Sequence, residues 1–297
     1  MRDVSLKRIL ATLALLALAA CNANGGSSTT FKPGDQIQVV TTFSTLNSFV
    51  NAVGGPYVHV QNLVPIGASP EDYQPTPQDI ATLADSQVLV MNGAGIEAWL
   101  TRTLADAKNP DLKVVVCTDG LPVKIGNPHL WMNPDYAKVY VQKIRDTLIA
   151  VDPTHKAAYI SNANRYDGVL EALADSIAQK IGTIPADQRN MIVFHNAWDY
   201  YDARFGLHTI GAIESSPGQE PNPQRIAQLV DLAKQYHVRA MFAEPEYSPK
   251  LVQSLAQSAG VKVVTDLYDD SIGADPRVHD YTSMLTYDTD TIVKALK

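Results

Sequence analysis

The chain has 297 residues, of which 45% are hydrophobic and 19% charged, and its formal net charge is −7. This composition excludes a disordered chain, and the length permits one large domain or two lobes of about 130 residues each. The acidic charge argues against a phosphate-backbone partner, so we expect no nucleic-acid binding.

The N-terminus differs from the rest of the chain. Arg2, Lys7 and Arg8 precede an apolar run, ILATLALLALAA, that ends directly before Cys21. This run is too short to cross a bilayer core of about 30 Å, so we predict a signal peptide over residues 1–20. The sequence LAAC resembles a bacterial lipobox, which implies cleavage before Cys21 and lipidation of its thiol. An ordinary signal peptide with an incidental cysteine is the alternative.

A linker and the second cysteine follow. Residues 21–34 include NANGGSSTT, a composition typical of flexible tethers that hold a folded body away from a membrane. The other cysteine is Cys117, so acylation of Cys21 would exclude an intramolecular disulfide. Because Cys117 lies in the strand-like run KVVVCTDG, we predict a buried small hydrophobe rather than a nucleophile.

Short runs rich in β-branched residues alternate with helical patterns along the whole body of the chain. This alternation predicts an α/β fold with two lobes, at 35–153 and 183–297, each a mainly parallel four-stranded sheet flanked by helices. The strand-like runs lie at 36–43, 58–65, 86–93 and 112–119, then at 190–196, 206–213, 238–245 and 261–268.

The two halves are separated by a stretch without internal proline, residues 154–182, whose apolar positions repeat at helical spacing. Pro153 precedes it and Gly182 ends it, both suitable boundary signals. We therefore predict one long helix that joins the lobes. Two shorter helices, broken near 162–164, are the alternative.

Common enzyme signatures are absent from the sequence. It has no phosphate-binding loop, no Gly-x-Ser-x-Gly elbow and no His-Glu-x-x-His pair, so we expect a protein that is not an enzyme. Histidines and acids instead follow the strand-like runs, where parallel sheets bind ligands. These residues are His129, His195, Glu244 and Asp266.

Five loops, in this order, resemble one family: PEDYQPTPQDI, NPHLWMNPDYA, VFHNAWDYYDARFGL, FAEPEYSPK and VTDLYDDSIG. They are similar to loops of the cluster A-I, or ZnuA/TroA-like, substrate-binding lipoproteins of bacterial manganese, zinc and iron ABC importers. The resemblance covers nearly all of the chain after the tether. It implies two lobes joined by one long helix, with a divalent metal ion between them as the transported ligand.

The resemblance also implies four metal ligands: Glu71, His129, His195 and Asp266. Glu71 stands where the family usually has histidine, and Asp72 is the alternative ligand in that loop. Asp266 has a competing role as a helix cap, with two further acids close behind it. Glu244 is interpreted as an acid that orients an imidazole ring.

The implied ligand set is two imidazoles and two carboxylates, which favours Mn²⁺ or Fe²⁺, with Zn²⁺ as the alternative. The resemblance further implies a monomer outside the cytoplasm, anchored to a membrane through Cys21 in the periplasm or at the cell surface, with an ABC permease as partner. We keep two alternatives. One is a surface adhesin whose metal site is structural or lost, and the other is a metallohydrolase that uses Glu244 as base.

Overall fold

The structure is a computed structural model and describes residues 35–214, 219, 221–245, 249–272 and 275–297. The predicted signal peptide, Cys21 and nearly all of the tether lie outside the described residues. Within the described part, none of the helices combines the length and the apolar character needed to cross a bilayer.

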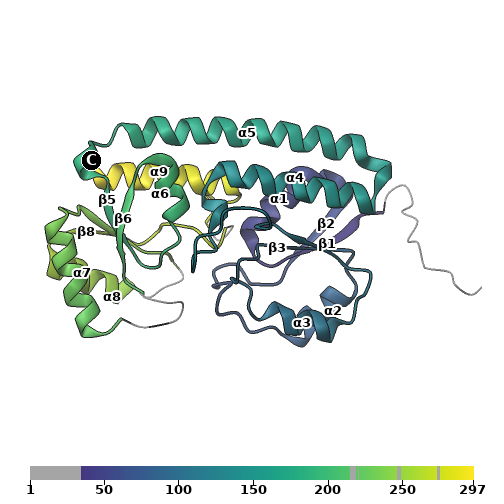
Figure 1. Cartoon of the computed structure of the whole chain (residues 1–297), viewed down its shortest axis with the longest axis horizontal. Helices are drawn as coiled ribbons and strands as arrows, with labels where there is room; N and C mark the ends of the chain where they lie inside the picture. The colour runs from purple at the N-terminus through teal and green to yellow at the C-terminus, as the bar shows by residue number, and fades with distance from the viewer. Residues whose placement is uncertain (1–34, 215–218, 220, 246–248, 273–274) are drawn as a thin grey trace, which may run out of the picture. The chain divides into compact units, whose positions relative to one another are not determined.

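The N-terminal lobe is built on a four-stranded sheet in the order β2-β1-β3-β4, with every pair parallel. The central strands β1 and β3 are rich in valine and largely buried, as is usual in parallel sheets covered by helices, whereas the edge strands β2 and β4 are partly exposed. α2 and α3 lie on one side of the sheet and α1 and α4 on the other (Figure 1). The elements are β1 (Ile37–Thr41), α1 (Ser44–Gly54), β2 (Val58–Asn62), α2 (Pro77–Ala84), β3 (Val88–Met91), α3 (Leu100–Ala107), β4 (Lys113–Val116) and α4 (Pro134–Val151).

The C-terminal lobe repeats this plan, with a parallel sheet in the order β6-β5-β7-β8. Its core is formed by Ile192, Leu229, Met241 and Val252, all completely buried. The elements are β5 (Asn190–Val193), α6 (Asp199–Phe205), β6 (His208–Ala212), α7 (Pro223–Gln235), β7 (Ala240–Phe242), α8 (Pro249–Ala259), β8 (Lys262–Val264) and α9 (Tyr281–Leu296). All eight predicted strands are therefore confirmed, and with them the two parallel sheets.

One long helix, α5 (Lys156–Gly182), connects the lobes. It follows a 3₁₀ turn at Pro153–His155 and runs without a break through 162–164, so the alternative of two shorter helices is wrong. Its 27 residues correspond to a rod of about 40 Å. α9 lies alongside α5 (Figure 1). A continuous helix of this length resists bending, which limits how far the lobes can move apart.

Cys117 follows β4 and is completely buried, as predicted. Burial raises the pKa of its thiol far above the usual value, with the nearby Glu97 acting in the same direction. Because the thiolate is the reactive form, Cys117 is an inert packing residue.

Candidate metal centre

The loop that carries Glu71 is held firmly against the N-terminal lobe. It joins β2 to α2, and the indole Nε1 of Trp99 donates a hydrogen bond to Pro70 O at 2.8 Å. The Tyr73 hydroxyl donates to Asp79 Oδ2 at 2.8 Å, and Asp79 also completes the capping box at the start of α2. Contacts on both sides of Glu71 therefore fix its main chain.

The two acids of this loop have different surroundings. The Glu71 side chain is only 11% exposed, and its Oε1 lies 3.9 Å from His129 Nε2. Asp72 is exposed to solvent. Burial raises the pKa of Glu71, while the charge of His195 lowers it and that of Asp72 raises it. The structure therefore brings Glu71, and not Asp72, towards the histidines.

His129 lies in the loop between β4 and α4, directly before the 3₁₀ turn Leu130–Met132. Its side chain is buried and packs against the Trp131 ring, with the ring centroids 5.1 Å apart. The preceding carbonyl, Pro128 O, accepts a hydrogen bond from Asn92 Nδ2 at 2.9 Å. Because Asn92 directly follows β3, this bond attaches the histidine loop to the end of the sheet.

His195 comes from the other lobe, two residues after β5. Its Nδ1 faces Glu244 Oε1 at 3.4 Å and Asp269 Oδ2 at 3.8 Å. Glu244 follows β7 and is buried, so it lies where a ring-orienting acid is expected. With Nδ1 directed at these acids, Nε2 of His195 is left to face His129.

The distances around His129 Nε2 fit a bound metal ion. This atom lies 3.3 Å from His195 Nε2, 3.6 Å from Asp270 Oδ1 and 3.9 Å from Glu71 Oε1. Two ligand atoms that are each about 2.1 Å from a tetrahedral metal lie about 3.4 Å apart. The ligand atoms of His129, His195 and Asp270 thus have nearly the spacing of a coordination shell, and Asp270 is absent from the predicted set. Glu71 lies near His129 but outside the group whose ligand atoms are all within 4.8 Å of one another.

The buried ligand-type side chains form two overlapping groups. His129, His195 and Asp270 offer ligand atoms within 4.8 Å of one another, and so do His195, Glu244 and Asp269. His195 belongs to both groups through its two ring nitrogens. The first group surrounds the position that a metal ion would occupy, and the second lies behind the His195 ring.

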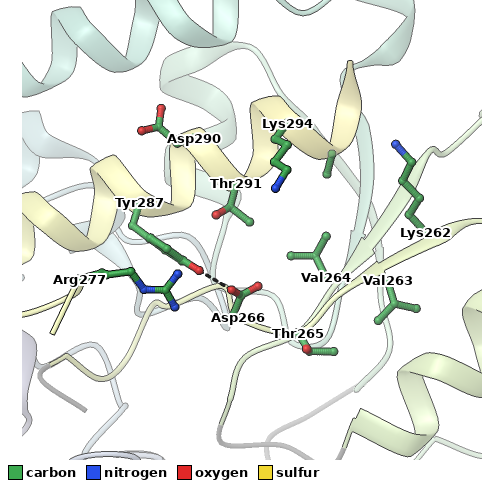
Figure 2. Close-up of a pocket in the computed structure, with 11 residues that line it drawn as sticks. Lys262, Val263, Val264, Thr265, Asp266, Arg277, Tyr287, Asp290, Thr291 and Lys294 are labelled. Atoms are coloured by element: carbon green, nitrogen blue, oxygen red, sulfur yellow. Dashed lines mark hydrogen bonds between the residues drawn. The ribbon is translucent and has the colours of Figure 1, made fainter. Parts of the chain in front are cut away.

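Two of the predicted ligands, Glu71 and Asp266, are in neither group. Asp266 lies away from the histidines. Its Oδ2 accepts a hydrogen bond from the Tyr287 hydroxyl (Figure 2). Both residues line a separate cavity of about 750 Å³ between β8 and α9, together with Arg277 and Lys294. The structure therefore places Asp270, rather than Asp266, beside the histidines.

Asp270 reaches the histidines because its loop is hydrogen-bonded to the N-terminal lobe, although the loop follows β8. Thr45 Oγ1 donates to Asp270 O at 3.3 Å, and Ser44 Oγ accepts from Ile272 N at 2.9 Å. Two further bonds of this kind run from Trp131 Nε1 to Asp269 O at 2.9 Å and from Gly67 N to Ser271 Oγ at 2.8 Å. The resemblance implied Asp266, the first acid after β8, which also fits the rule that ligands follow strand ends. Neither argument contains information about these long-range bonds.

The pKa values of the two histidines are shifted in opposite directions. Burial, together with the charge of His195, holds the pKa of His129 well below its usual value. Burial also disfavours a charged His195, but the nearby carboxylates of Asp269 and Glu244 outweigh it and raise the pKa of His195 well above the usual value. The pair therefore combines one neutral imidazole with one that holds a proton.

Comparisons with known proteins identify the family of the chain. The family described as zinc-uptake complex component A, periplasmic, matches residues 39–295. The manganese-binding lipoprotein MntA of Halalkalibacterium halodurans is 30% identical over 301 residues, covering 100% of this chain and 99% of the relative. The iron-binding protein YfeA of Yersinia pestis is 29% identical over 302 residues, covering 99% and 96%.

Solved structures show the same fold. A crystal structure of ZnuA superposes with a TM-score of 0.80 at 29% identity, covering 89% of this chain and 100% of the other. The manganese-bound periplasmic metal binding protein from Candidatus Liberibacter asiaticus gives a TM-score of 0.80 at 22% identity, covering 88% and 100%. At that identity the second match is a likeness of fold alone.

Proposed function

From the premise that this chain belongs to the family of periplasmic zinc-uptake components, we propose that it is the solute-binding component of a metal importer. It captures one divalent transition metal ion between its lobes and delivers the ion to an ABC permease. The family consists of transport components, and the protein acts on its cargo by binding and release rather than by chemical conversion.

The observation that carries this proposal is the convergence of ligand atoms from both lobes on His129 Nε2. His129 Nε2 has His195 Nε2, Asp270 Oδ1 and Glu71 Oε1 as neighbours at 3.3, 3.6 and 3.9 Å. Two neutral imidazoles and two carboxylates would balance the charge of one divalent ion in a buried site. We assign the metal to these four residues, with Glu244 and Asp269 orienting the His195 ring.

The chemistry of the four ligands indicates the class of metal. Two carboxylates make a harder set than three imidazoles and one carboxylate, and hard sets suit Mn²⁺ and Fe²⁺. Two of the relatives are named for manganese and for iron. Zn²⁺ binds most such sites more tightly than either ion, so discrimination against it depends on geometry and on supply.

The division of the ligands between the lobes suggests how the ion is released. Glu71 and His129 belong to the N-terminal lobe, and Asp270 is hydrogen-bonded to that lobe through its main chain. His195 is thus the ligand that moves with the C-terminal sheet. Because α5 resists large lobe movements, we propose that a small displacement of His195 opens the coordination shell.

We place the protein outside the cytoplasm, as a monomer anchored through a lipid on Cys21. The support is the lipobox-like LAAC sequence and the two relatives named as lipoproteins, MntA and the manganese transporter lipoprotein PsaA of Streptococcus anginosus. A flexible tether after Cys21 would let the folded body reach a permease in the same membrane.

Metal analysis tests the proposed function. The protein is purified without chelators after growth with Mn²⁺, Fe²⁺ and Zn²⁺, and metal content is measured by mass spectrometry. We expect about one ion per chain, and a melting temperature that rises when metal is added back after chelation, since a ligand that binds only the folded state stabilises it. His129→Ala should lose both effects, while the control His279→Ala, at an exposed histidine, should keep them. Wild-type protein without stoichiometric metal or thermal stabilisation would contradict the proposal.

A further inference from the structure

The side chain of Asn127 lies between the two histidine segments and is hydrogen-bonded to both. Its Oδ1 accepts from His129 N at 3.1 Å and lies 3.0 Å from His129 Nδ1. Its Nδ2 donates to Asn196 O at 2.9 Å, and Asn196 directly follows His195. Asn127 is 3% exposed, and its two contacts with His129 are buried, while its bond to Asn196 O is partly buried.

The partners determine which way the amide points. A main-chain N–H can only donate, so the atom next to His129 N must be the oxygen of Asn127. A carbonyl can only accept, so the atom next to Asn196 O must be the nitrogen. Both contacts require the same orientation of the amide.

This orientation also determines where His129 carries its proton. The Asn127 oxygen faces His129 Nδ1 at 3.0 Å and can only accept a hydrogen bond. Nδ1 is therefore the protonated nitrogen of the neutral ring, and Nε2 carries the lone pair. Nε2 is the atom that faces His195, Asp270 and Glu71, so the tautomer selected by Asn127 is the one that can bind the metal.

The other end of the amide connects the lobes. The bond from Asn127 Nδ2 crosses to the main chain beside His195. Tyr200, in α6 of the C-terminal lobe, donates from its hydroxyl to Asn127 O at 2.9 Å and accepts from Lys124 N at 2.7 Å. The loop 124–127 is thus bonded to the C-terminal lobe at several points, next to the ligand that we expect to move.

We propose that Asn127 is a positioning residue with two separable roles: its oxygen selects the metal-binding tautomer of His129, and its nitrogen restrains the lobe movement that displaces His195. This inference rests on the proposed function. The amide oxygen would thus determine the metal affinity, and the amide nitrogen the rate of metal release.

Two substitutions separate the roles. Asn127→Asp keeps an acceptor for His129 N and Nδ1 but loses the donor to Asn196 O. We expect it to bind Zn²⁺ at least as tightly as wild type and to release it about 5-fold faster, the factor for one lost buried hydrogen bond. Asn127→Ala loses both ends, and we expect an affinity about 10–100-fold weaker, as for other outer partners of metal-bound histidines.

Tyr200→Phe is an independent test of the lobe contact. It removes the hydroxyl hydrogen bonds at the same junction and leaves the contacts of His129 intact. We expect it to release Zn²⁺ faster than wild type while keeping the wild-type affinity. The measurements are Kd by competition with a chromophoric chelator and the dissociation rate by stopped-flow transfer to excess chelator.

Nitrogen NMR of metal-free protein reads the tautomer directly. In wild type and Asn127→Asp we expect His129 protonated at Nδ1, and in Asn127→Ala a mixture of tautomers. An unchanged tautomer and Kd in Asn127→Ala would overturn the first role, and unchanged release in both Asn127→Asp and Tyr200→Phe would overturn the second. Wild-type protein that binds no Zn²⁺, Mn²⁺ or Fe²⁺ would refute the proposed function itself, whereas the tautomer would still be measurable.

Discussion

The Nε2 atoms of His129 and His195 lie 3.3 Å apart, although the two residues belong to different lobes. In the metal-free protein this contact is a hydrogen bond, because the raised pKa of His195 keeps a proton on that ring and the lowered pKa of His129 leaves a lone pair opposite it. A metal ion that binds both atoms must displace this proton. We therefore expect metal binding to release a proton.

We expect metal affinity to rise with pH through the neutral range. His195 is the group that must lose a proton, and its pKa is raised because the carboxylates of Asp269 and Glu244 outweigh the cost of burial. Below that pKa, one bound proton competes with each metal ion, so the apparent affinity should fall about tenfold per pH unit. Calorimetry at pH 7 in buffers of different ionisation enthalpy should give about one proton released per metal ion. Affinity that is equal at pH 5.5 and 7.5 would contradict this linkage.

Asp270 and Asp266 can be distinguished by parallel substitutions. Asp270→Asn should weaken metal binding by more than the roughly 100-fold that loss of an outer partner costs, because Asp270 Oδ1 lies beside His129 Nε2. Asp266→Asn should change affinity by less than about 3-fold, since its carboxylate is hydrogen-bonded to Tyr287 away from the histidines. Titration against a competing chelator measures both. The opposite ranking would return the ligand role to Asp266.

Glu71 should influence the choice of metal. Glu71→His makes the set three imidazoles and one carboxylate, which is softer, so the ratio of Zn²⁺ to Mn²⁺ affinity should rise. Asp72→His is the control, because Asp72 is the exposed neighbour in the same loop and should leave the ratio unchanged. Competition between the two metals, read by mass spectrometry, gives the ratio. An unchanged ratio in Glu71→His would mean that Glu71 does not contact the metal.

Asp202 should make the protein less stable as pH rises. Burial raises the pKa of Asp202 to about 7, although hydrogen bonds from Thr209 oppose the shift. Between about pH 4 and pH 7, the folded state therefore holds a proton that the unfolded state has lost. Stability should therefore fall by up to about 1.4 kcal/mol per pH unit over that range from this group. Asp202→Asn keeps an acceptor for Thr209 N and removes the ionisation. The variant's free energy of unfolding, measured with denaturant, should exceed that of wild type by more at pH 8 than at pH 5. An equal difference at both pH values would refute the role of Asp202.

Much of the fold was predictable because its signals are local. The valine-rich runs around Val39, Val90 and Val115 are typical of strands buried on both faces, and all eight predicted strands are present. The helical spacing of apolar residues between 154 and 182 likewise predicted α5. His195 follows β5 by two residues and His129 lies in the loop after β4, so the rule that ligands bind at strand ends pointed to the edge of the sheet where both are found.

The aspartate could not be assigned in the same way. Asp266, Asp269 and Asp270 lie within five residues, and any of them satisfies a rule based on the distance from a strand. The bonds that decide between them join Asp270 to Thr45 and Ile272 to Ser44, across more than 200 positions in the chain. No local pattern contains such partners.

The sequence alone predicted the two parallel sheets and the connecting helix, because periodicity is a property of neighbouring residues. The imidazole and carboxylate ligands followed from the resemblance of five loops to one family, and they stay a prediction. Tertiary structure decided which atoms meet. It placed Asp270 rather than Asp266 beside His129, directed the Glu244 carboxylate to His195 Nδ1, and oriented the Asn127 amide. The first and third outcomes depend on hydrogen bonds between the lobes, and the second on the pairing of β5 with β7 within one sheet. All of these contacts form only when segments far apart in the chain have packed together.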